Sequence, residues 1–121
     1  DHLFRILLNL ARNAVEAARR GDGDDESERA GGLVRVTAMR TEDGRIAVEI
    51  CDDGPGVPEH LKPKLFDAFQ SGARPGGTGL GLSIAAELAH MSGGTLTLAE
   101  PGGRGADDPC RGARFVLTLP A

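Results

Sequence analysis

The chain has 121 residues, among them 18 glycines and four phenylalanines, but neither tryptophan nor tyrosine. That length suits one domain, which buries roughly two-thirds of the surface of its unfolded chain, and aliphatic side chains must fill the core. The formal net charge is −4 without any basic block. Aromatic platforms for bases are also few, so the composition argues against nucleic-acid binding. No apolar run approaches the roughly 20 residues of a membrane span, and we expect no membrane contact from this chain.

The first expected element is a helix over residues 2–20. Its apolar residues recur at about 100° per residue and share one sector. That sector is formed by Ile6, Leu7, Leu10, Ala14, Ala17 and Ala18. Four more apolar residues widen it, namely Phe4, Leu8, Ala11 and Val15. A solvent-facing stripe consists of Arg5, Arg12 and Arg19, and the seam between stripe and sector holds Asn9 and Asn13.

After a polar, Gly-rich loop at 21–32, alternating apolar residues predict four strands, near 34–39, 46–50, 96–98 and 115–119. The Asp-Gly pair in the turn at 41–44 joins the first two strands into a hairpin. We further expect a short helix over 59–66 and a long helix over 80–91. Together these elements predict an α/β two-layer sandwich, in which helices cover a largely antiparallel sheet.

The cysteines and histidines are scattered. Cys51 and Cys110 stand 59 positions apart, and the three histidines occur singly, as His2, His60 and His90. This spacing argues against a metal site built from cysteine and histidine. We expect the two cysteines to be buried or incidental thiols of a reducing compartment.

Asp52 shares the alternation of Ile46, Val48 and Ile50, so its carboxylate points to the core side if the strand runs that far. A buried carboxylate without a partner is costly. One interpretation is that the strand stops at Cys51 and Asp52 only starts a turn. The other is that a ligand donor, such as an exocyclic amino group, satisfies it. Gly54 and Gly56 would then let a flat ligand approach the backbone.

Asn9 and Asn13 lie one helical turn apart and face the same way. They are either surface amides at a helix edge or oxygen ligands for Mg²⁺, which needs few protein groups when substrate phosphates complete its shell. A glycine-rich string at 76–83 leads directly into the second long helix. It is either a flexible loop with a helix start or an anion site made of free backbone amides.

Three motifs occur in one order: Asn9-x-x-x-Asn13-Ala14, Asp52-x-Gly54-x-Gly56 and the Gly-Thr-Gly-Leu-Gly-Leu-Ser string at 77–83. Together they resemble the ATP-binding catalytic domain of bacterial sensor histidine kinases, within the Bergerat-fold ATPases. Residues 65–69 look like the F box of that family, and residues 112–120 look like its closing strand. The resemblance covers nearly the whole chain and implies a mixed, largely antiparallel sheet. It also implies that residues 1–121 are a fragment, with the leading strand and the histidine-bearing dimerisation domain outside it.

The resemblance implies a role for each matching residue. Asp52 would accept the adenine amino group, with Gly54 and Gly56 lining the base. Asn13 would bind Mg²⁺ that bridges the phosphates, with Asn9 nearby. The ATP lid would span 70–79, and phosphates would meet the backbone of Thr78, Gly79, Leu80 and Gly81. Arg74 is the candidate phosphate clamp.

By resemblance, the domain would transfer the γ-phosphoryl group of ATP to a histidine on a separate dimerisation domain. The parent protein would be a cytoplasmic or membrane-anchored homodimer that acts on a response regulator. Related ATPases that hydrolyse ATP carry Glu where Asn9 stands, and an amide cannot act as a general base.

Three positions depart from the family pattern: Glu16 replaces a frequent Lys, Ala17 replaces a frequent aromatic residue, and Ala113 replaces a frequent Thr. Two alternatives therefore stay open. One is a degenerate docking or phosphotransfer module without ATP binding, and the other is a Ser/Thr kinase of the anti-sigma type.

Overall fold

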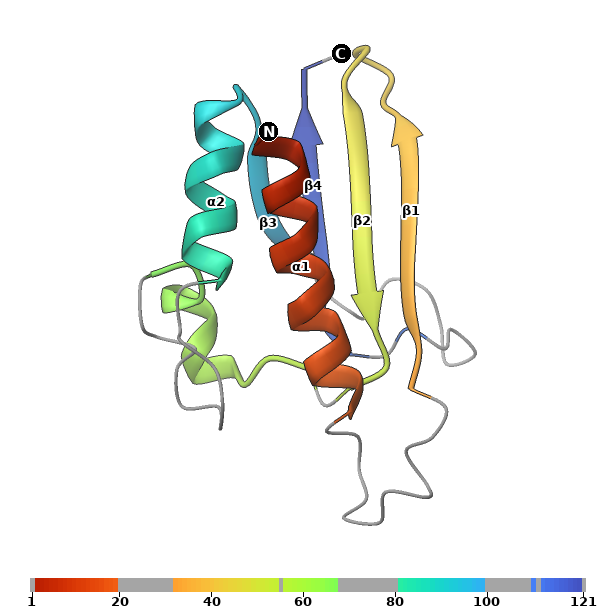
Figure 1. Cartoon of the computed structure of the whole chain (residues 1–121), viewed down its shortest axis with the longest axis vertical. Helices are drawn as coiled ribbons and strands as arrows, with labels where there is room; N and C mark the ends of the chain where they lie inside the picture. Colours follow the sequence, from red (N-terminus) through yellow and green to blue (C-terminus); the bar gives the residue numbers. More distant parts are fainter. Residues whose placement is uncertain are drawn as a thin grey trace.

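The structure, a computed structural model, describes residues 2–19, 32–54, 56–67, 81–99, 110 and 112–120. Its elements in chain order are α1 (His2–Arg19), β1 (Val34–Arg40), β2 (Ile46–Asp52), the 3₁₀ helix η1 (Glu59–Lys64), α2 (Gly81–Met91), β3 (Thr95–Ala99) and β4 (Arg114–Leu119). The strands form one sheet in the order β1-β2-β4-β3, and both α-helices lie on the same face of it (Figure 1). The predicted two-layer sandwich is confirmed, and every pair among the described strands is antiparallel.

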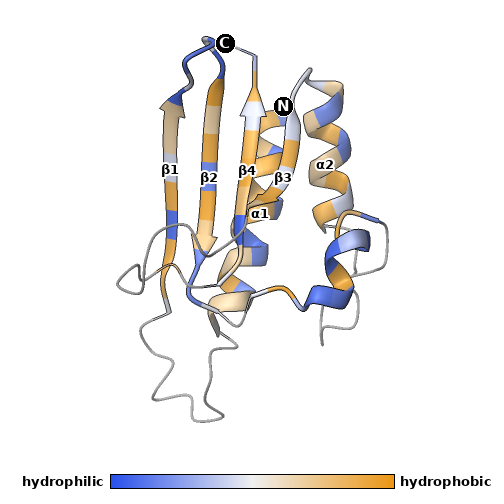
Figure 2. Ribbon diagram, turned by 180° about the vertical axis from the view of Figure 1, so that it is seen from behind, coloured by the Kyte–Doolittle hydropathy of each residue, from blue (hydrophilic) through white to orange (hydrophobic). Residues whose placement is uncertain are grey.

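The sheet is built around β2, which pairs with β1 on one side and with β4 on the other. The predicted hairpin is confirmed, because β1 and β2 pair from Val34↔Asp52 to Arg40↔Ile46. Gly44 takes a φ of +85° in the connecting turn, a conformation that favours glycine. Figure 2 shows the sheet from the side without helices, where hydrophobic residues are dense along β4 and β3. Since β1 is an edge strand, most of its side chains stay exposed.

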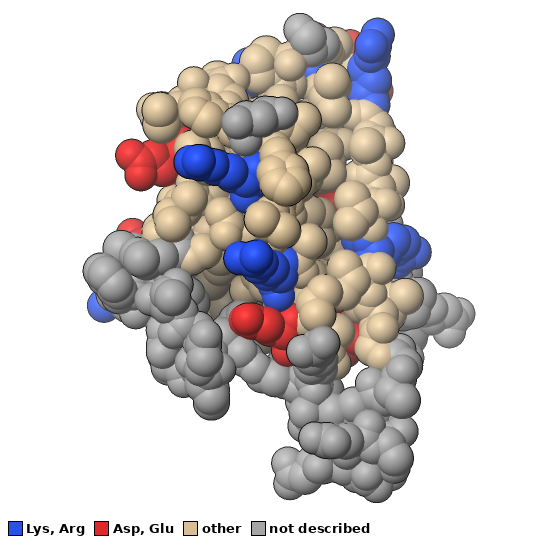
Figure 3. Space-filling view, in the orientation of Figure 1, with Lys and Arg blue, Asp and Glu red and all other residues tan. Residues whose placement is uncertain are grey.

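Helix α1 has a buried side and an exposed side. The buried side includes Ile6, Leu10 and Ala14, as the helical period predicts. The prediction that the sector widens further is wrong at three positions, since the exposed fractions are 59% for Phe4, 38% for Leu8 and 41% for Val15. The reason is that, among the described elements, α2 lies beside α1 on one flank only (Figure 1). Figure 3 shows mostly uncharged side chains on this face, with separate basic and acidic groups among them.

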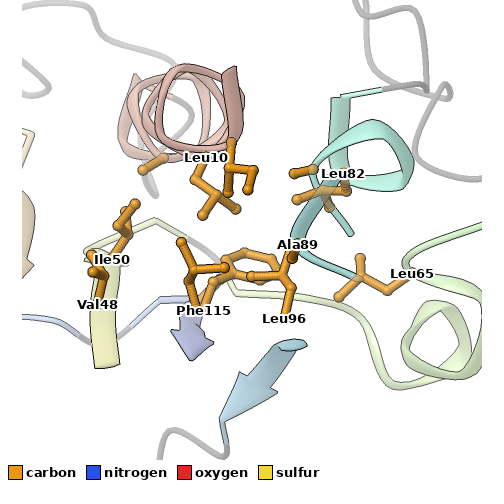
Figure 4. Packing of buried hydrophobic residues seen from close by; sticks show 13 residues of the cluster. Leu10, Val48, Ile50, Leu65, Leu82, Ala89, Leu96 and Phe115 are labelled. Carbon is orange, nitrogen blue, oxygen red and sulfur yellow. The ribbon is translucent and has the colours of Figure 1, made fainter. Parts of the chain in front are cut away.

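The core lies between the two helices and the sheet (Figure 4). Each layer contributes aliphatic side chains, and the largest buried side chain is Phe115 of β4. The residues labelled in the view are Leu10, Val48, Ile50, Leu65, Leu82, Ala89, Leu96 and Phe115. Full burial of one such large side chain contributes roughly 1.5–3 kcal/mol, so this cluster is the main force that joins the layers.

The short helix expected over 59–66 is the 3₁₀ helix η1, which ends at Lys64 and contains Pro63. The residues that follow it tie this connection to the core. Leu65 is buried, and the ring of Phe66 meets Phe115 edge to face, with 6.1 Å between the ring centroids. The connection lies beneath the start of α2 (Figure 1).

Candidate functional site

Asp52 is the last residue of β2, and its side chain is only 1% exposed. The strand therefore does run through Asp52, and the interpretation that it stops at Cys51 is wrong. The ladder continues at this point because Asp52 N–H donates to the Ala113 carbonyl at 3.1 Å and Gly112 N–H donates to the Asp52 carbonyl at 2.8 Å. The carboxylate consequently lies on the same face as Ile50, toward the helices.

Backbone amides hold the Asp52 carboxylate in one orientation. Its Oδ1 accepts hydrogen bonds from Gly54 N–H at 2.9 Å and from Ala113 N–H at 3.3 Å. Gly54 stands two residues further along the chain, whereas Ala113 directly precedes β4 and is 61 residues away in the sequence. The carboxylate position thus depends on two segments that only the folded sheet brings together.

Glycines surround this carboxylate for a reason within the chain itself. A Cβ on Gly112 would lie 2.2 Å from Asp52 Oδ1 and 2.7 Å from Gly54 N. A Cβ on Gly54 would lie 2.3 Å from the Ala17 carbonyl oxygen of α1. Gly56 instead takes a φ of +80°, which favours glycine. The bare backbone at 54 and 112 is required by close packing between segments, and its predicted contact with a base stays a prediction.

Helix α1 supplies the amides that the sequence analysis singled out. Asn9 and Asn13 are both half-buried. A Cβ on Gly81, the first residue of α2, would lie 3.9 Å from Asn9 Oδ1. One turn beyond Asn13, Ala17 contacts the backbone at Gly54. The structure therefore brings α1, the end of β2 and the start of α2 to one region.

Four predicted site residues lie outside the residues that the structure describes: Arg74, Thr78, Gly79 and Leu80. The same is true of the proposed lid at 70–79. Gly81 is described, and it begins α2 as the glycine string predicts. Within the described ranges, no group of three or more histidine, cysteine or acidic residues is arranged to hold a metal ion.

Sequence reasoning missed a covalent link beside the site. Cys51 and Cys110 form a disulfide, so the expectation of free thiols is wrong. The physical reason is the register of the sheet: Cys51 pairs with Arg114, which draws the residues before β4 alongside the end of β2. The available signal in the sequence was that both cysteines stand next to candidate motifs: Cys51 precedes Asp52, and Cys110 stands two residues before Gly112.

An ion pair on the same face of β2 as Cys51 was also missed. Arg114 Nε lies 3.2 Å from Glu49 Oε1, and the two side chains are 6% and 12% exposed. Glu49 and Cys51 alternate with Ile50 and Asp52, so they point away from the helices. The two faces at the end of β2 therefore differ: the carboxylate lies on the helix side, and the disulfide and ion pair lie behind it.

The part of the chain that the structure describes contains no helix with the length and apolar character needed to span a bilayer.

Comparison with known proteins gives a consistent result. Residues 1–121 match the family described as histidine kinase-, DNA gyrase B-, and HSP90-like ATPase. The chain is 41% identical over 119 residues to the signal transduction histidine-protein kinase AfsQ2 of Streptomyces coelicolor, covering 95% of this chain and 18% of that protein.

Solved structures agree. The mycobacterial sensor histidine kinase MprB matches with a TM-score of 0.73 and 26% identity, over 98% of this chain and 72% of that chain. Full-length ShkA in complex with AMPPNP matches with a TM-score of 0.70 and 31% identity, over 98% of this chain and 21% of that chain.

Proposed function

We propose, from the premise that this chain belongs to the family of histidine kinase-, DNA gyrase B- and HSP90-like ATPases, that it binds Mg²⁺-ATP and presents the γ-phosphoryl group to a histidine on a separate domain. The observation that carries the proposal is Asp52, a buried carboxylate that backbone amides hold at the end of the central strand β2. Two proteins that the chain resembles, AfsQ2 and MprB, are named as histidine kinases.

Asp52 is suited to recognise a purine that carries an amino group. A buried carboxylate needs polar partners, and an exocyclic amino group is a donor of the right kind. Its orientation is fixed by the amides of Gly54 and Ala113 before any ligand arrives. Gly54 and Gly112 are packed against neighbouring segments, whereas the nearest described atom to a Cβ on Gly56 would be the Gly112 carbonyl carbon, at 4.0 Å. A flat base could therefore lie against the backbone at Gly56.

The amides of α1 and the start of α2 are suited to the phosphates. Asn13 would offer its amide oxygen to Mg²⁺, an ion that prefers oxygen ligands and neutralises phosphate charge when bound. Gly81 begins α2 close to Asn9, and the first amides of a helix have no partner within that helix. By the same proposal, Thr78, Gly79 and Leu80 add backbone donors, and Arg74 acts as the clamp.

Asn9 decides where the phosphoryl group goes. An amide cannot remove a proton from water, so Asn9 would favour transfer to a protein nucleophile over hydrolysis. His2, His60 and His90 are exposed, but none stands in a His-Glu-x-x-x-Pro sequence. The acceptor histidine would therefore belong to a dimerisation domain outside this chain, in a homodimer of the parent protein in the cytoplasm. A response regulator would be the next acceptor.

Titration of ATP into the chain by calorimetry, with and without Mg²⁺, tests the proposal together with the variant Asp52→Asn. The substitution keeps the shape of the side chain but removes the charge and places a donor beside the base amino group. A hydrogen bond to a charged group contributes about 1.5–3 kcal/mol, so we expect ATP affinity to fall about tenfold or more. Asp53→Asn is the matched control, because Asp53 is the neighbouring carboxylate and should change ATP affinity by less than about twofold.

Equal ATP affinity in Asp52→Asn and the unmodified chain would contradict the role of Asp52. Absence of ATP binding by the unmodified chain would favour the degenerate docking module. The chain alone should hydrolyse ATP slowly, and rapid turnover would contradict the role of Asn9. If phosphate appears on a partner protein in acid-stable form, the Ser/Thr kinase alternative gains, because phosphohistidine is acid-labile.

A further inference from the structure

The Cys51–Cys110 disulfide joins the two segments that hold Asp52. Cys51 is the residue before Asp52 on β2, and Cys110 stands two residues before Gly112. The two Cα atoms are 5.7 Å apart, and the residues are 1% and 2% exposed. Neither cysteine has a part in the proposed reaction, so their position beside the site calls for its own explanation.

Hydrogen bonds between Asp52 and the backbone of residues 112–113 join the same two segments. Asp52 N–H donates to the Ala113 carbonyl, and Gly112 N–H donates to the Asp52 carbonyl. Ala113 N–H donates to the carboxylate Oδ1 at 3.3 Å. The covalent bond lies behind the sheet, and the carboxylate lies on the helix side, because adjacent residues of a strand point to opposite faces. The disulfide therefore links the strand at Asp52 to residues 110–113 on the face opposite the helices, and it does not occupy the face on which the carboxylate lies.

The packing at Gly112 leaves little freedom for this segment to move. Its backbone approaches Asp52 so closely that even a Cβ would lie 2.2 Å from Oδ1 and 2.9 Å from the Asp52 carbonyl oxygen. A shift of residues 112–113 by a fraction of an ångström would therefore lengthen the hydrogen bond to Oδ1 or press on the carboxylate. Anything that anchors Cys110 controls the position of the carboxylate.

We propose that the Cys51–Cys110 disulfide is a redox-sensitive positioning element for Asp52, so that the oxidised chain binds adenine nucleotides more tightly than the reduced chain. The inference rests on the proposed function. It also agrees with the compartment that function implies, because disulfides in a reducing compartment are commonly transient and redox-sensing.

The chemistry is ordinary thiol–disulfide exchange. A dithiol reductant attacks one sulfur as its thiolate, and the Sγ–Sγ bond between Cys51 and Cys110 breaks through a mixed disulfide. Two electrons and two protons pass to the protein, which gains two thiols, and the dithiol becomes a cyclic disulfide. An oxidised dithiol or a small-molecule disulfide reverses the step by accepting the same electrons and protons. Since both sulfurs belong to buried residues, exchange requires local opening and should be slow.

The test measures ATP and GTP affinity of the chain by calorimetry after full oxidation and after long incubation with dithiothreitol. Alkylation and intact mass establish the number of thiols in each sample. Loss of one well-placed hydrogen bond corresponds to about fivefold in affinity, so we expect ATP affinity to fall about fivefold on reduction. GTP lacks the amino group at the same ring position, so its affinity should fall less. A merely structural effect would lower the affinity for both nucleotides alike.

The double variant Cys51→Ala/Cys110→Ala is the matched control. It should bind ATP as weakly as the reduced chain and should not respond to dithiothreitol. Thermal unfolding of each sample confirms that the protein is folded at the titration temperature.

The outcomes separate the two proposals. If the oxidised chain binds no ATP, the proposed function fails. If the oxidised chain binds ATP and reduction leaves its affinity unchanged, only the present inference is overturned. Two free thiols in the chain after treatment with oxidised glutathione would also overturn it, as would an equal loss of ATP and GTP affinity.

Discussion

Two aspartates, Asp52 at one end of β2 and Asp43 in the turn before its other end, are held in different ways. At one end Asp52 is buried, and one of its two amide donors lies 61 residues away in the sequence. At the other end Asp43 is exposed in the β1–β2 turn, where its partners are Thr41 and Arg45, two residues to either side. The comparison teaches that the contacts of Asp43 arise within a short stretch of sequence, whereas the carboxylate of Asp52 also needs a donor that only the folded sheet brings to it.

The largest expected effect is a loss in the free energy of unfolding when the disulfide between Cys51 and Cys110 is removed. Cys51→Ala/Cys110→Ala removes a link that closes a loop of about 60 residues, and loop-closure entropy predicts a loss of about 4 kcal/mol in the free energy of unfolding. Urea unfolding of the variant, compared with the oxidised chain, measures the loss. A change below about 1 kcal/mol would show that the end of β2 near Asp52 does not depend on this link.

Substitution of one glycine near each end of β2 tests the difference between the two ends directly. Gly112→Ala places a Cβ 2.2 Å from Asp52 Oδ1, and overpacking of this kind costs about 1–3 kcal/mol. At Gly44 a Cβ would meet nothing within 4 Å, so Gly44→Ala costs only the positive φ, about 1 kcal/mol. Gly112→Ala should also weaken ATP binding, whereas Gly44→Ala should leave it unchanged. Equal effects of both variants on ATP affinity would remove the distinction between the two ends.

The smallest effect concerns Asp43. The hydrogen bond from the Thr41 hydroxyl lowers the pKa of Asp43 below its ordinary value of 3.8, and the Arg45 backbone amide adds to this. Because the folded pKa is the lower one, the contribution of Asp43 to stability is complete above about pH 3.8. It is lost as pH falls through the folded pKa. An NMR titration of the Asp43 carboxyl should give a midpoint below 3.8 that Thr41→Val raises. A midpoint at or above 3.8 in the unmodified chain would be inconsistent with this turn.

Sequence patterns predicted what depends on neighbouring residues. The helix over 2–20 follows from a period of 3.6, and the hairpin follows from a period of 2 together with its Asp-Gly turn; these are properties of short windows. The exposure of Phe4, Leu8 and Val15 could not be predicted in this way, because helical period does not show which flank another element covers.

In the candidate site, too, features that depend on short sequence windows were easier to predict than features that depend on tertiary contacts. Alternation gave the direction of the Asp52 side chain only on the condition that the strand reaches Asp52, and the sequence left that condition open. The end of the strand, the pairing of Cys51 with Cys110 and the contact of Gly112 with Asp52 all required the β2–β4 register. The roles in ATP binding remain predictions for all the candidate residues: Asn9, Asn13, Asp52, Gly54, Gly56, Gly81 and the four residues outside the described ranges.

The central place of β2 has a consequence for a chain that emerges residue by residue from the ribosome. Its hairpin partner β1 is made just before it, whereas its other partner, β4, is the last of the described strands in chain order. Asp52 is therefore synthesised 61 residues before Ala113, whose amide it needs as a hydrogen-bond donor. The pair of amide donors at Asp52 Oδ1 therefore forms only after residue 113 has been made, and a chain truncated before Gly112 would lack the donor from Ala113.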